Sequence, residues 1–193
     1  MVYPLLVFVH VAGAIGIFVA LSIEGVSLRR LRVEMTPGGA RVWTSLLRWA
    51  ARTGIATMVV TIAAGGTLMA MAWHHQPWID AAFVGILAMA ILGGAVSGRR
   101  LRQLRALLIA ETGSELSDRF QQARSSGALV TSLVLRISNG LGIVALMTAK
   151  PGAGDSALIL AAAVVAGAAI SLVQLRKNAS SSLRVSFGAS SGT

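Results

Sequence analysis

Five long apolar stretches decide what this chain can fold into. Each contains close to the roughly 20 residues that a helix needs to cross a hydrocarbon core of about 30 Å. They run continuously through Ala, Leu, Val, Ile and Gly, without the alternation of apolar and polar side chains that is typical of barrel strands. We therefore predict an all-α integral membrane protein, a five-transmembrane-helix bundle that forms a single domain over residues 1–176. The predicted spans cover residues 3–28, 53–73, 79–98, 127–149 and 156–175.

The positive charges lie almost wholly between these stretches. The chain has 17 Lys and Arg against 7 Asp and Glu, a formal net charge of +10. Nearly all of the basic residues follow the first, third or fifth span, which leaves Lys150 in the opposite connection and Arg136 within the fourth span. By the positive-inside rule the arginine-rich segments are cytoplasmic. With five spans, the N-terminus is then expected outside and the C-terminus inside.

The basic residues do not form one patch, so we expect no nucleic-acid partner. A basic inner surface is instead expected to hold anionic lipid head groups at the cytoplasmic face. After Lys177 the composition turns to Ser, Ala and Gly without an apolar period, which predicts a flexible cytoplasmic tail over residues 177–193. The absence of cysteine excludes disulfides, thiolate metal sites and cysteine nucleophiles.

The cytoplasmic connections show short helical patterns. Between Arg41 and Arg52, apolar and basic residues alternate in a way suited to a short helix on the membrane surface, leading straight into the second span. The third span is expected to continue past residue 98, because leucines recur there on one helical face. Thr112 and Glu115 have the spacing of a capping box, which predicts a further short helix after them.

Two of the ionisable residues within the predicted spans are Glu24 and Arg136, and such residues are costly enough to be informative. Glu24 lies on the same stripe of the first span as His10, and Arg136 begins a polar stripe in the fourth span. These spans run in opposite directions and both residues lie in the inner half, so an ion pair is geometrically reasonable. We interpret the pair as structural, a buried charge satisfied by its opposite. A proton or anion path is the alternative, as is a fold in which the two never meet.

His10 lies about 10 Å below the outer boundary if the first span begins near Tyr3, at 1.5 Å per residue. We interpret it as a hydrogen-bonded packing residue, a haem ligand or a metal ligand. For a bis-histidine haem the second ligand would be His74 or His75. Two ligands of one iron lie about 4 Å apart, given metal–nitrogen distances near 2 Å, whereas the predicted depths differ by more. Bis-histidine ligation is therefore disfavoured.

A candidate metal site lies at the outer end of the second span. There Met71 shares a helical face with His74 and His75. Thioether and imidazole ligands at an outer face suit Cu(I), and both His10 and Met147 could approach the same mouth. The candidate ligands are thus His10, Met71, His74 and His75. The alternative is that the methionine fills a packing gap and that the two adjacent histidines are simply polar.

Three motifs carry a resemblance to a known family. They are Val9-His10-Val11-Ala12-Gly13-Ala14 in the first span, Arg136 at the start of the polar stripe of the fourth, and Met147-Thr148-Ala149-Lys150-Pro151, which closes that span. With them the chain resembles a group of uncharacterised bacterial inner-membrane proteins related to the copper-resistance D (CopD-like) family, over nearly all the spans. The resemblance implies a multi-pass protein of a bacterial inner (plasma) membrane. It also raises copper as the metal for His10.

The functional expectations follow from these features. Small residues are abundant in the spans, which favours close helix packing within the chain, in a homo-oligomer or in a larger membrane complex. We expect a non-enzymatic accessory or assembly subunit that packs within the membrane. The alternatives are a copper-handling or transport protein with a His/Met site in the outer half of the bundle, and a haem-b-binding membrane redox protein. Catalysis by side chains alone is not indicated, because the sequence has no paired carboxylates, activated nucleophile or phosphate-binding glycine loop.

Overall fold

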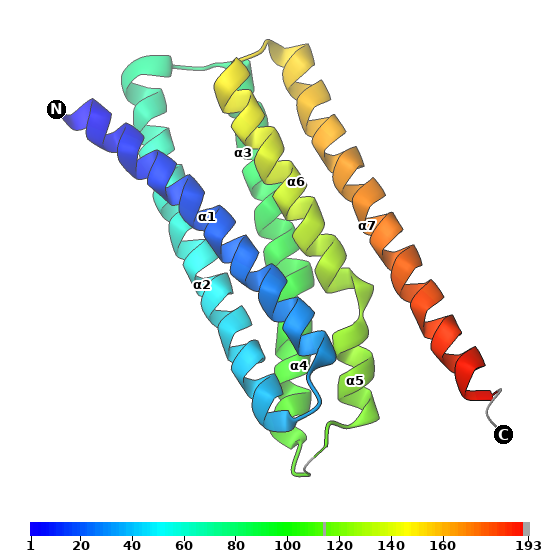
Figure 1. Ribbon diagram of the computed structural model, residues 1–193. Coiled ribbons are helices and arrows are strands. Elements are labelled where there is room, and N and C mark those ends of the chain that lie inside the picture. Colours follow the sequence, from blue (N-terminus) through cyan, green and yellow to red (C-terminus); the bar gives the residue numbers. More distant parts are fainter. Residues whose placement is uncertain (114, 191–193) are drawn as a thin grey trace.

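The computed structural model describes residues 1–113 and 115–190, with side chains described up to Arg176. This part of the chain is helical with short connections and has no strand, as the sequence predicts. It contains five helices that are long and apolar enough to span a membrane, which lie side by side as a bundle (Figure 1). These helices cover Val2–Val33, Pro37–Trp73, Pro77–Ala110, Asp118–Ala149 and Ala153–Arg176.

The first two helices form an antiparallel pair. α1 (Val2–Val33) and α2 (Pro37–Leu68) lie against each other along most of their length (Figure 1). Gly16 makes the close approach possible, because a Cβ there would lie only 2.5 Å from the Thr57 Cγ2. The Thr57 hydroxyl donates to the Thr53 carbonyl at 2.9 Å, so the interface leaves it satisfied. This is the packing by small residues that lipid-embedded helices favour.

α2 is continuous from Pro37 to Leu68, so the segment between Arg41 and Arg52 leads straight into the second span, as expected, but as part of one long helix and not as a short helix of its own. The helix begins at Pro37, and the Thr36 hydroxyl caps it by accepting from the Gly39 amide at 3.1 Å. The reason for the continuity is a buried face that recurs every three or four residues through this segment and packs on α1 and α4. That face comprises Ala40, Thr44, Leu47 and Ala50.

The third membrane helix does continue past residue 98, as expected. It consists of α3 (Pro77–Ile91), a π-helical segment η2 (Leu92–Gly98) and α4 (Arg99–Ala110) without a break. A second π-helical segment, η1 (Met69–Trp73), ends the second membrane helix. π-Helical turns widen a helix locally and are frequent at functional sites.

A short helix follows α4, but not from the predicted capping box. α5 (Asp118–Ser125) is capped by Ser117, whose hydroxyl accepts from the Phe120 amide at 3.4 Å. The carboxylate of Glu111 in turn accepts from the Ser117 amide at 3.2 Å and from its hydroxyl. Thr112 and Glu115 therefore lie in the connection, because the buried side chain of Phe120 sets where the helix must begin.

A cluster of fully buried side chains lies at the arginine-rich end of the bundle. Leu31 of α1, Leu104 of α4 and Phe120 of α5 are each at most 1% exposed. Arg124 of α5 reaches across and donates to the Leu31 carbonyl at 3.1 Å and to the Glu34 carbonyl. A cation thereby satisfies the last carbonyls of α1, where the helix dipole favours positive charge. The packing at this end of the bundle therefore resembles the hydrophobic core of a small soluble protein.

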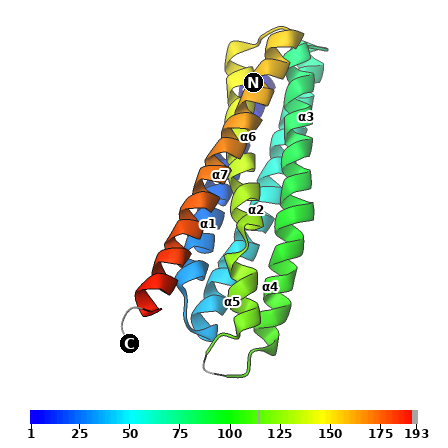
Figure 2. The ribbon, with the colours of Figure 1, turned by 90° about the vertical axis from the view of Figure 1, so that its right-hand side faces the viewer.

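The last two helices complete the bundle. α6 (Gly127–Ala149) contacts α1, α3 and α7 (Ala153–Ser190), and Figure 2 shows α7 running alongside α6 at the edge of the molecule. A Cβ on Gly142 of α6 would lie 2.8 Å from the Ala163 Cβ, so these two helices also pack through small residues. The flexible tail predicted for residues 177–193 falls on the end of α7. Its backbone stays helical to Ser190, since extending an existing helix costs little, and its side chains and residues 191–193 lie outside the described part.

Candidate functional site

His10 is held against α2 by one directional hydrogen bond. Its Nδ1 lies 2.9 Å from the Thr61 carbonyl oxygen. A carbonyl can only accept, so Nδ1 carries a proton, which leaves Nε2 as the ring nitrogen whose lone pair can bind a ligand. Nε2 has no hydrogen-bond partner in the described residues. Because these residues contain no side-chain nitrogen or oxygen that is both buried and without a partner, Nε2 is accessible at the surface of a cavity or of the molecule. A hydrogen bond of this kind from the opposite ring nitrogen is what orients a ligating histidine.

Gly65 makes room for this ring. A Cβ at residue 65 would lie 2.9 Å from the His10 Cε1 and 3.0 Å from its Nδ1, but 4.0 Å from Nε2. The imidazole therefore rests edge-on against the α2 backbone, with Nε2 as the ring nitrogen farther from Gly65. The neighbouring Gly66 has nothing within 4 Å of its Cβ position, so the two glycines have different roles.

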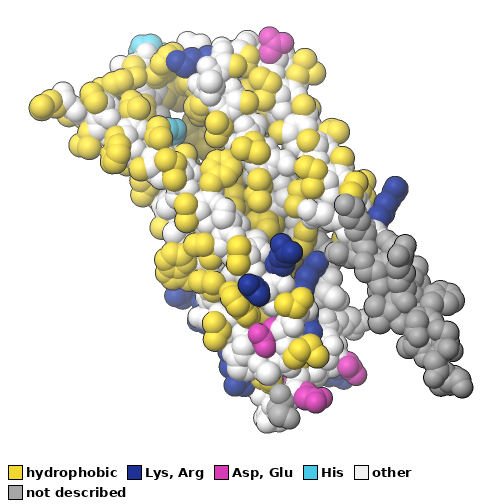
Figure 3. All heavy atoms as spheres, viewed as in Figure 1, with side chains coloured by type: hydrophobic (Ala, Val, Ile, Leu, Met, Phe, Trp, Pro, Cys, Tyr) yellow, Lys and Arg dark blue, Asp and Glu magenta, His cyan; other side chains and the backbone are white. Residues whose placement is uncertain are grey.

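Two adjoining cavities meet at His10. One has a volume of about 220 Å³ and the other of about 400 Å³, and both are lined by His10, Thr61, Ile86 and Met147. The remaining walls are almost wholly apolar. In the space-filling view the molecule is hollowed between α1 and α6, where the two helices diverge at the end of the bundle that holds the N-terminus (Figure 3). Volumes in the hundreds of Å³ with apolar walls and a few polar groups are usual for small-molecule sites.

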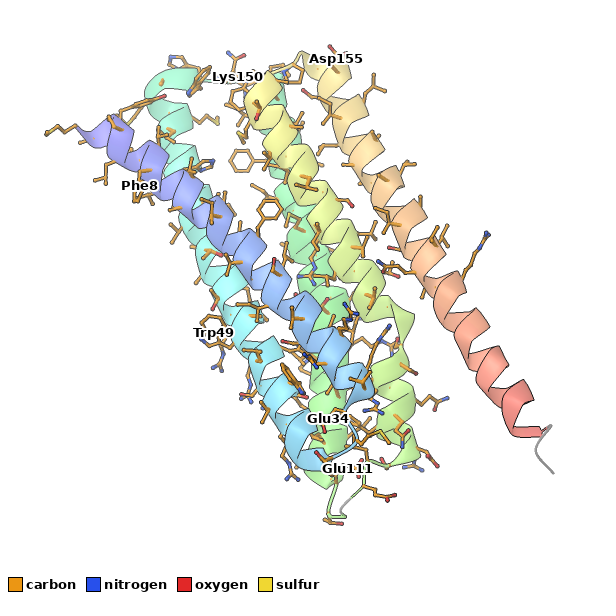
Figure 4. All side chains as sticks on the ribbon, in the orientation of Figure 1. Phe8, Glu34, Trp49, Glu111, Lys150 and Asp155 are labelled. Carbon is orange, nitrogen blue, oxygen red and sulfur yellow. The ribbon has the colours of Figure 1, made fainter. Side chains whose placement is uncertain are left out.

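Lys150 and two tryptophans stand at the mouth of the smaller cavity. The Lys150 Nζ lies 4.1 Å from the centre of the Trp73 ring, a cation–π contact, and Trp73 meets Trp78 edge to face at 5.6 Å. Figure 4 shows Lys150 at the end of the bundle that holds the N-terminus, opposite Glu34 and Glu111. The cavity therefore has an apolar interior and one positive charge at its rim.

Lys150, which lines the smaller cavity, has a backbone conformation that L residues rarely adopt. In the described residues, His74 and Lys150 are the non-glycine residues with positive φ, at 48° and 49°. Lys150 follows α6 in the left-handed conformation, at the position where helices commonly use glycine. A side chain kept where glycine would be easier indicates that the side chain itself is needed.

The structure does not bring the four predicted metal ligands together. His10 lines both cavities, whereas Met71, His74 and His75 line neither. The second membrane helix ends at Trp73, so the helical face that would have aligned Met71 with the two histidines stops before them. His75 instead lies 3.1 Å from Asp80 at the surface. The described residues contain no group of three or more His, Cys, Asp or Glu that could hold a metal ion.

Glu24 and Arg136 do lie together, deeper in the bundle. Arg136 donates to the Glu24 carboxylate, and both side chains are only 10% exposed. The guanidinium also donates to the Ser97 hydroxyl at 3.1 Å and to the Ser132 carbonyl at 3.3 Å. The Ser132 hydroxyl donates in turn to the Leu92 carbonyl of η2 at 3.1 Å, so the π-helical segment and the ion pair form one network.

A cavity of about 360 Å³ borders this network. Its polar lining is Glu24, Arg136 and Arg102, and its other walls are mostly small or apolar residues of α1, α2, α3 and η2. Because the charges of Glu24 and Arg136 cancel and their hydrogen bonds are made, the pair is chemically satisfied as it stands. This arrangement fits a structural role.

Sequence reasoning missed several of the functional residues. Thr61 contributes only its backbone oxygen to His10, which no side-chain pattern reveals. Gly65 resembles any other small residue of a membrane helix. Lys150 carried a usable signal, since it is a cation isolated on the side opposite to the arginines. Comparison with protein-family models, curated proteins and solved structures finds no match to this chain.

Proposed function

We propose that this chain is a non-enzymatic accessory subunit of a bacterial inner membrane that holds haem b in its outer half, with His10 as an axial ligand. The N-terminus lies outside and the C-terminus in the cytoplasm, because most of the basic side chains lie toward one end of the bundle (Figure 3) and Lys150 lies at the other (Figure 4). Anionic lipids surround the arginine-rich end, and small-residue faces support packing into a homo-oligomer or a larger membrane complex.

The hydrogen bond from His10 Nδ1 to the Thr61 carbonyl is the observation that carries this proposal. It fixes the tautomer in which Nε2 is unprotonated and able to bind iron. Gly65 has no side chain and therefore leaves room for the imidazole to lie against the α2 backbone. This close fit holds the ring in one orientation, which supports a role in binding more than a role in filling space. The Thr61 carbonyl thus orients His10 in the way that a hydrogen bond to the far ring nitrogen orients a ligating histidine.

The surroundings of His10 fit haem in the same way. The cavities supply apolar walls for a flat macrocycle, and Lys150 at the rim supplies a positive charge for acidic substituents that reach the surface. Met147 lines both cavities with His10, so its thioether would be a second side chain able to hold the iron. When bound, haem would provide one-electron redox chemistry.

Copper is the second candidate, and one observation favours it. His10, Met69 and Met147 all line the smaller cavity, and an imidazole with two thioethers is a soft donor set that suits Cu(I). Against it, Lys150 lines the same cavity, and its positive charge repels a metal cation. The donor set also differs from the predicted one, since Met71, His74 and His75 do not contribute.

An absorption spectrum combined with elemental analysis tests both candidates. The protein is purified in mild detergent without added metal, as wild type and with His10→Ala or His75→Ala. We expect a Soret band in the wild type and in the His75→Ala control, whose altered residue lines neither cavity, and its loss in His10→Ala. Stoichiometric copper without a Soret band would replace haem with copper. A clean spectrum without metal would overturn the site and leave a packing subunit.

The orientation has its own test, since the wild-type chain contains no cysteine. Asp155→Cys places a thiol at the exposed start of α7, and Ser125→Cys places one at the exposed end of α5. A membrane-impermeant maleimide added to intact cells should label the first and not the second. Labelling of Ser125→Cys alone would invert the topology.

A further inference from the structure

We propose that a groove between α2 and α4 at the arginine-rich end binds the phosphate group of an anionic phospholipid. The groove has a volume of about 270 Å³. The inference does not depend on what occupies the His10 cavities, which lie toward the other end of the bundle. The groove is lined from α2 by Arg41, Thr44, Ser45 and Arg48, and from α4 by Arg105, Leu108 and Ile109.

The charges of this groove are uncompensated. Three guanidinium groups converge on it from two helices, and its lining includes no carboxylate. Arg41 uses one nitrogen on the Glu111 backbone carbonyl at 3.2 Å. Within the residues that the structure describes, Arg48 and Arg105 have neither a hydrogen bond nor an ion pair, although both are half-buried. Like charges held together in this way repel one another, and a bound anion would relieve that repulsion. Planar guanidinium groups match phosphate oxygens with paired hydrogen bonds.

Other interior arginines of this protein show the contrast. Arg136 has Glu24 and two further acceptors, and Arg124 donates to two backbone carbonyls at the end of α1. The fold therefore provides partners for the arginines that it uses structurally. The guanidinium groups of Arg48 and Arg105 have been brought together without such partners.

The position of the groove identifies a lipid as the source of the phosphate. The apolar stretch of α2 begins only a few residues beyond Arg48, so the groove lies at the level where lipid head groups meet the hydrocarbon. Trp49 is 53% exposed and points away from the bundle in Figure 4, as an interfacial anchor does. Ile109, beside the groove, is 78% exposed and offers apolar surface next to the charges.

Native mass spectrometry of the detergent-solubilised protein tests the proposal. Phosphatidylglycerol is added to wild type, to Arg48→Gln/Arg105→Gln and to Arg29→Gln/Arg30→Gln, which removes two exposed arginines at the end of α1. Wild type and the α1 control should retain one phosphatidylglycerol equally well. The groove variant should bind it roughly 10- to 30-fold more weakly, from about 1 kcal/mol for each cation. Equal weakening in both variants would overturn the site.

Two further arms identify the source of the phosphate. Wild type and the groove variant should bind phosphatidylcholine with the same affinity. Inorganic phosphate at the same concentration should not displace phosphatidylglycerol from wild type. Displacement by inorganic phosphate would mean that the groove takes the free anion, which overturns the lipid assignment. Arg48→Lys/Arg105→Lys keeps the charge and loses the paired hydrogen bonds, so it should lie between wild type and the Gln variant. It also preserves the test if the Gln variant does not fold.

Discussion

Glu24 of α1 and Arg136 of α6 form an ion pair in the middle of the bundle, with each side chain only 10% exposed. The two residues are far apart in the sequence, so the pair fixes how the first hairpin sits against α6. Ser97 of the third membrane helix also accepts a hydrogen bond from Arg136 at 3.1 Å. One guanidinium therefore connects three of the five membrane helices.

Replacing one partner of this pair should be worse than replacing both. Arg136→Leu leaves the Glu24 carboxylate buried without its cation and should cost about 3 kcal/mol of unfolding free energy. Glu24→Leu/Arg136→Leu removes both charges and should recover much of that loss. Denaturant unfolding in mild detergent measures the two. If the double variant loses as much as the sum of the two single variants, the pair is not coupled.

Gly65→Ala should disturb His10 although it adds only a methyl group. That methyl would lie 2.9 Å from the His10 Cε1, so the ring must leave its seat and its bond to the Thr61 carbonyl. We expect the Soret absorbance per protein to fall by at least half. The control is Gly66→Ala, which meets nothing within 4 Å and, as a Gly-to-Ala change inside a helix, should leave absorbance intact and stability equal or higher. Equal absorbance in both variants would contradict the conclusion that Gly65 makes room for the His10 ring.

Lys150→Gly should weaken haem binding without lowering the stability of the fold. Glycine adopts a φ of 49° without steric cost, so the variant should unfold at the same temperature as wild type or higher. It also removes the positive charge at the cavity mouth, which should weaken retention of a prosthetic group with acidic substituents. Haem retention during dilution into detergent measures the effect. Lys150→Arg keeps the positive charge and can still stack on Trp73, so it should retain haem as wild type does. Weaker retention in Lys150→Arg would contradict the idea that a positive charge at this position is sufficient.

The fold could be predicted further than the site. Apolar stretches long enough to cross a bilayer must be helical in lipid, and that physical constraint alone predicts the five membrane helices. The helix boundaries at the arginine-rich end are harder to predict from the sequence. There Leu31, Leu104 and Phe120 form a soluble-type core, and the burial of Phe120 overrides the capping pattern at Thr112 and Glu115.

The site could be predicted only where a charge or ring stands out in an apolar segment. His10, Glu24 and Arg136 are visible for this reason. Met71, His74 and His75 were grouped on the assumption that the second helix continues, whereas η1 ends it at Trp73 and His74 turns the chain at a φ of 48°. A local change of backbone geometry of this kind depends on tertiary packing and leaves no periodic signal in the sequence.

The connection between α1 and α2 should make stability depend on pH. Glu34 accepts from the Thr36 hydroxyl at 2.8 Å and from the Thr36 and Met35 amides at 3.1 Å each. The Thr36 hydroxyl and amide bonds lower the pKa of Glu34 below its usual value of 4.5. A carboxyl with a lowered folded-state pKa stabilises the fold above its unfolded pKa, and this contribution is lost as the pH falls through the folded pKa.

Glu34→Gln should therefore be less stable than wild type at neutral pH, and the difference should shrink between about pH 5 and pH 3. Thermal unfolding in detergent at a series of pH values measures this. Glu115→Gln removes an exposed carboxylate that makes no hydrogen bond within the described residues, so its difference from wild type should stay constant. A difference for Glu34→Gln that did not change with pH would show that its carboxylate does not hold the turn through its charge. In that case the start of α2 would depend on the Thr36 cap and Pro37 alone.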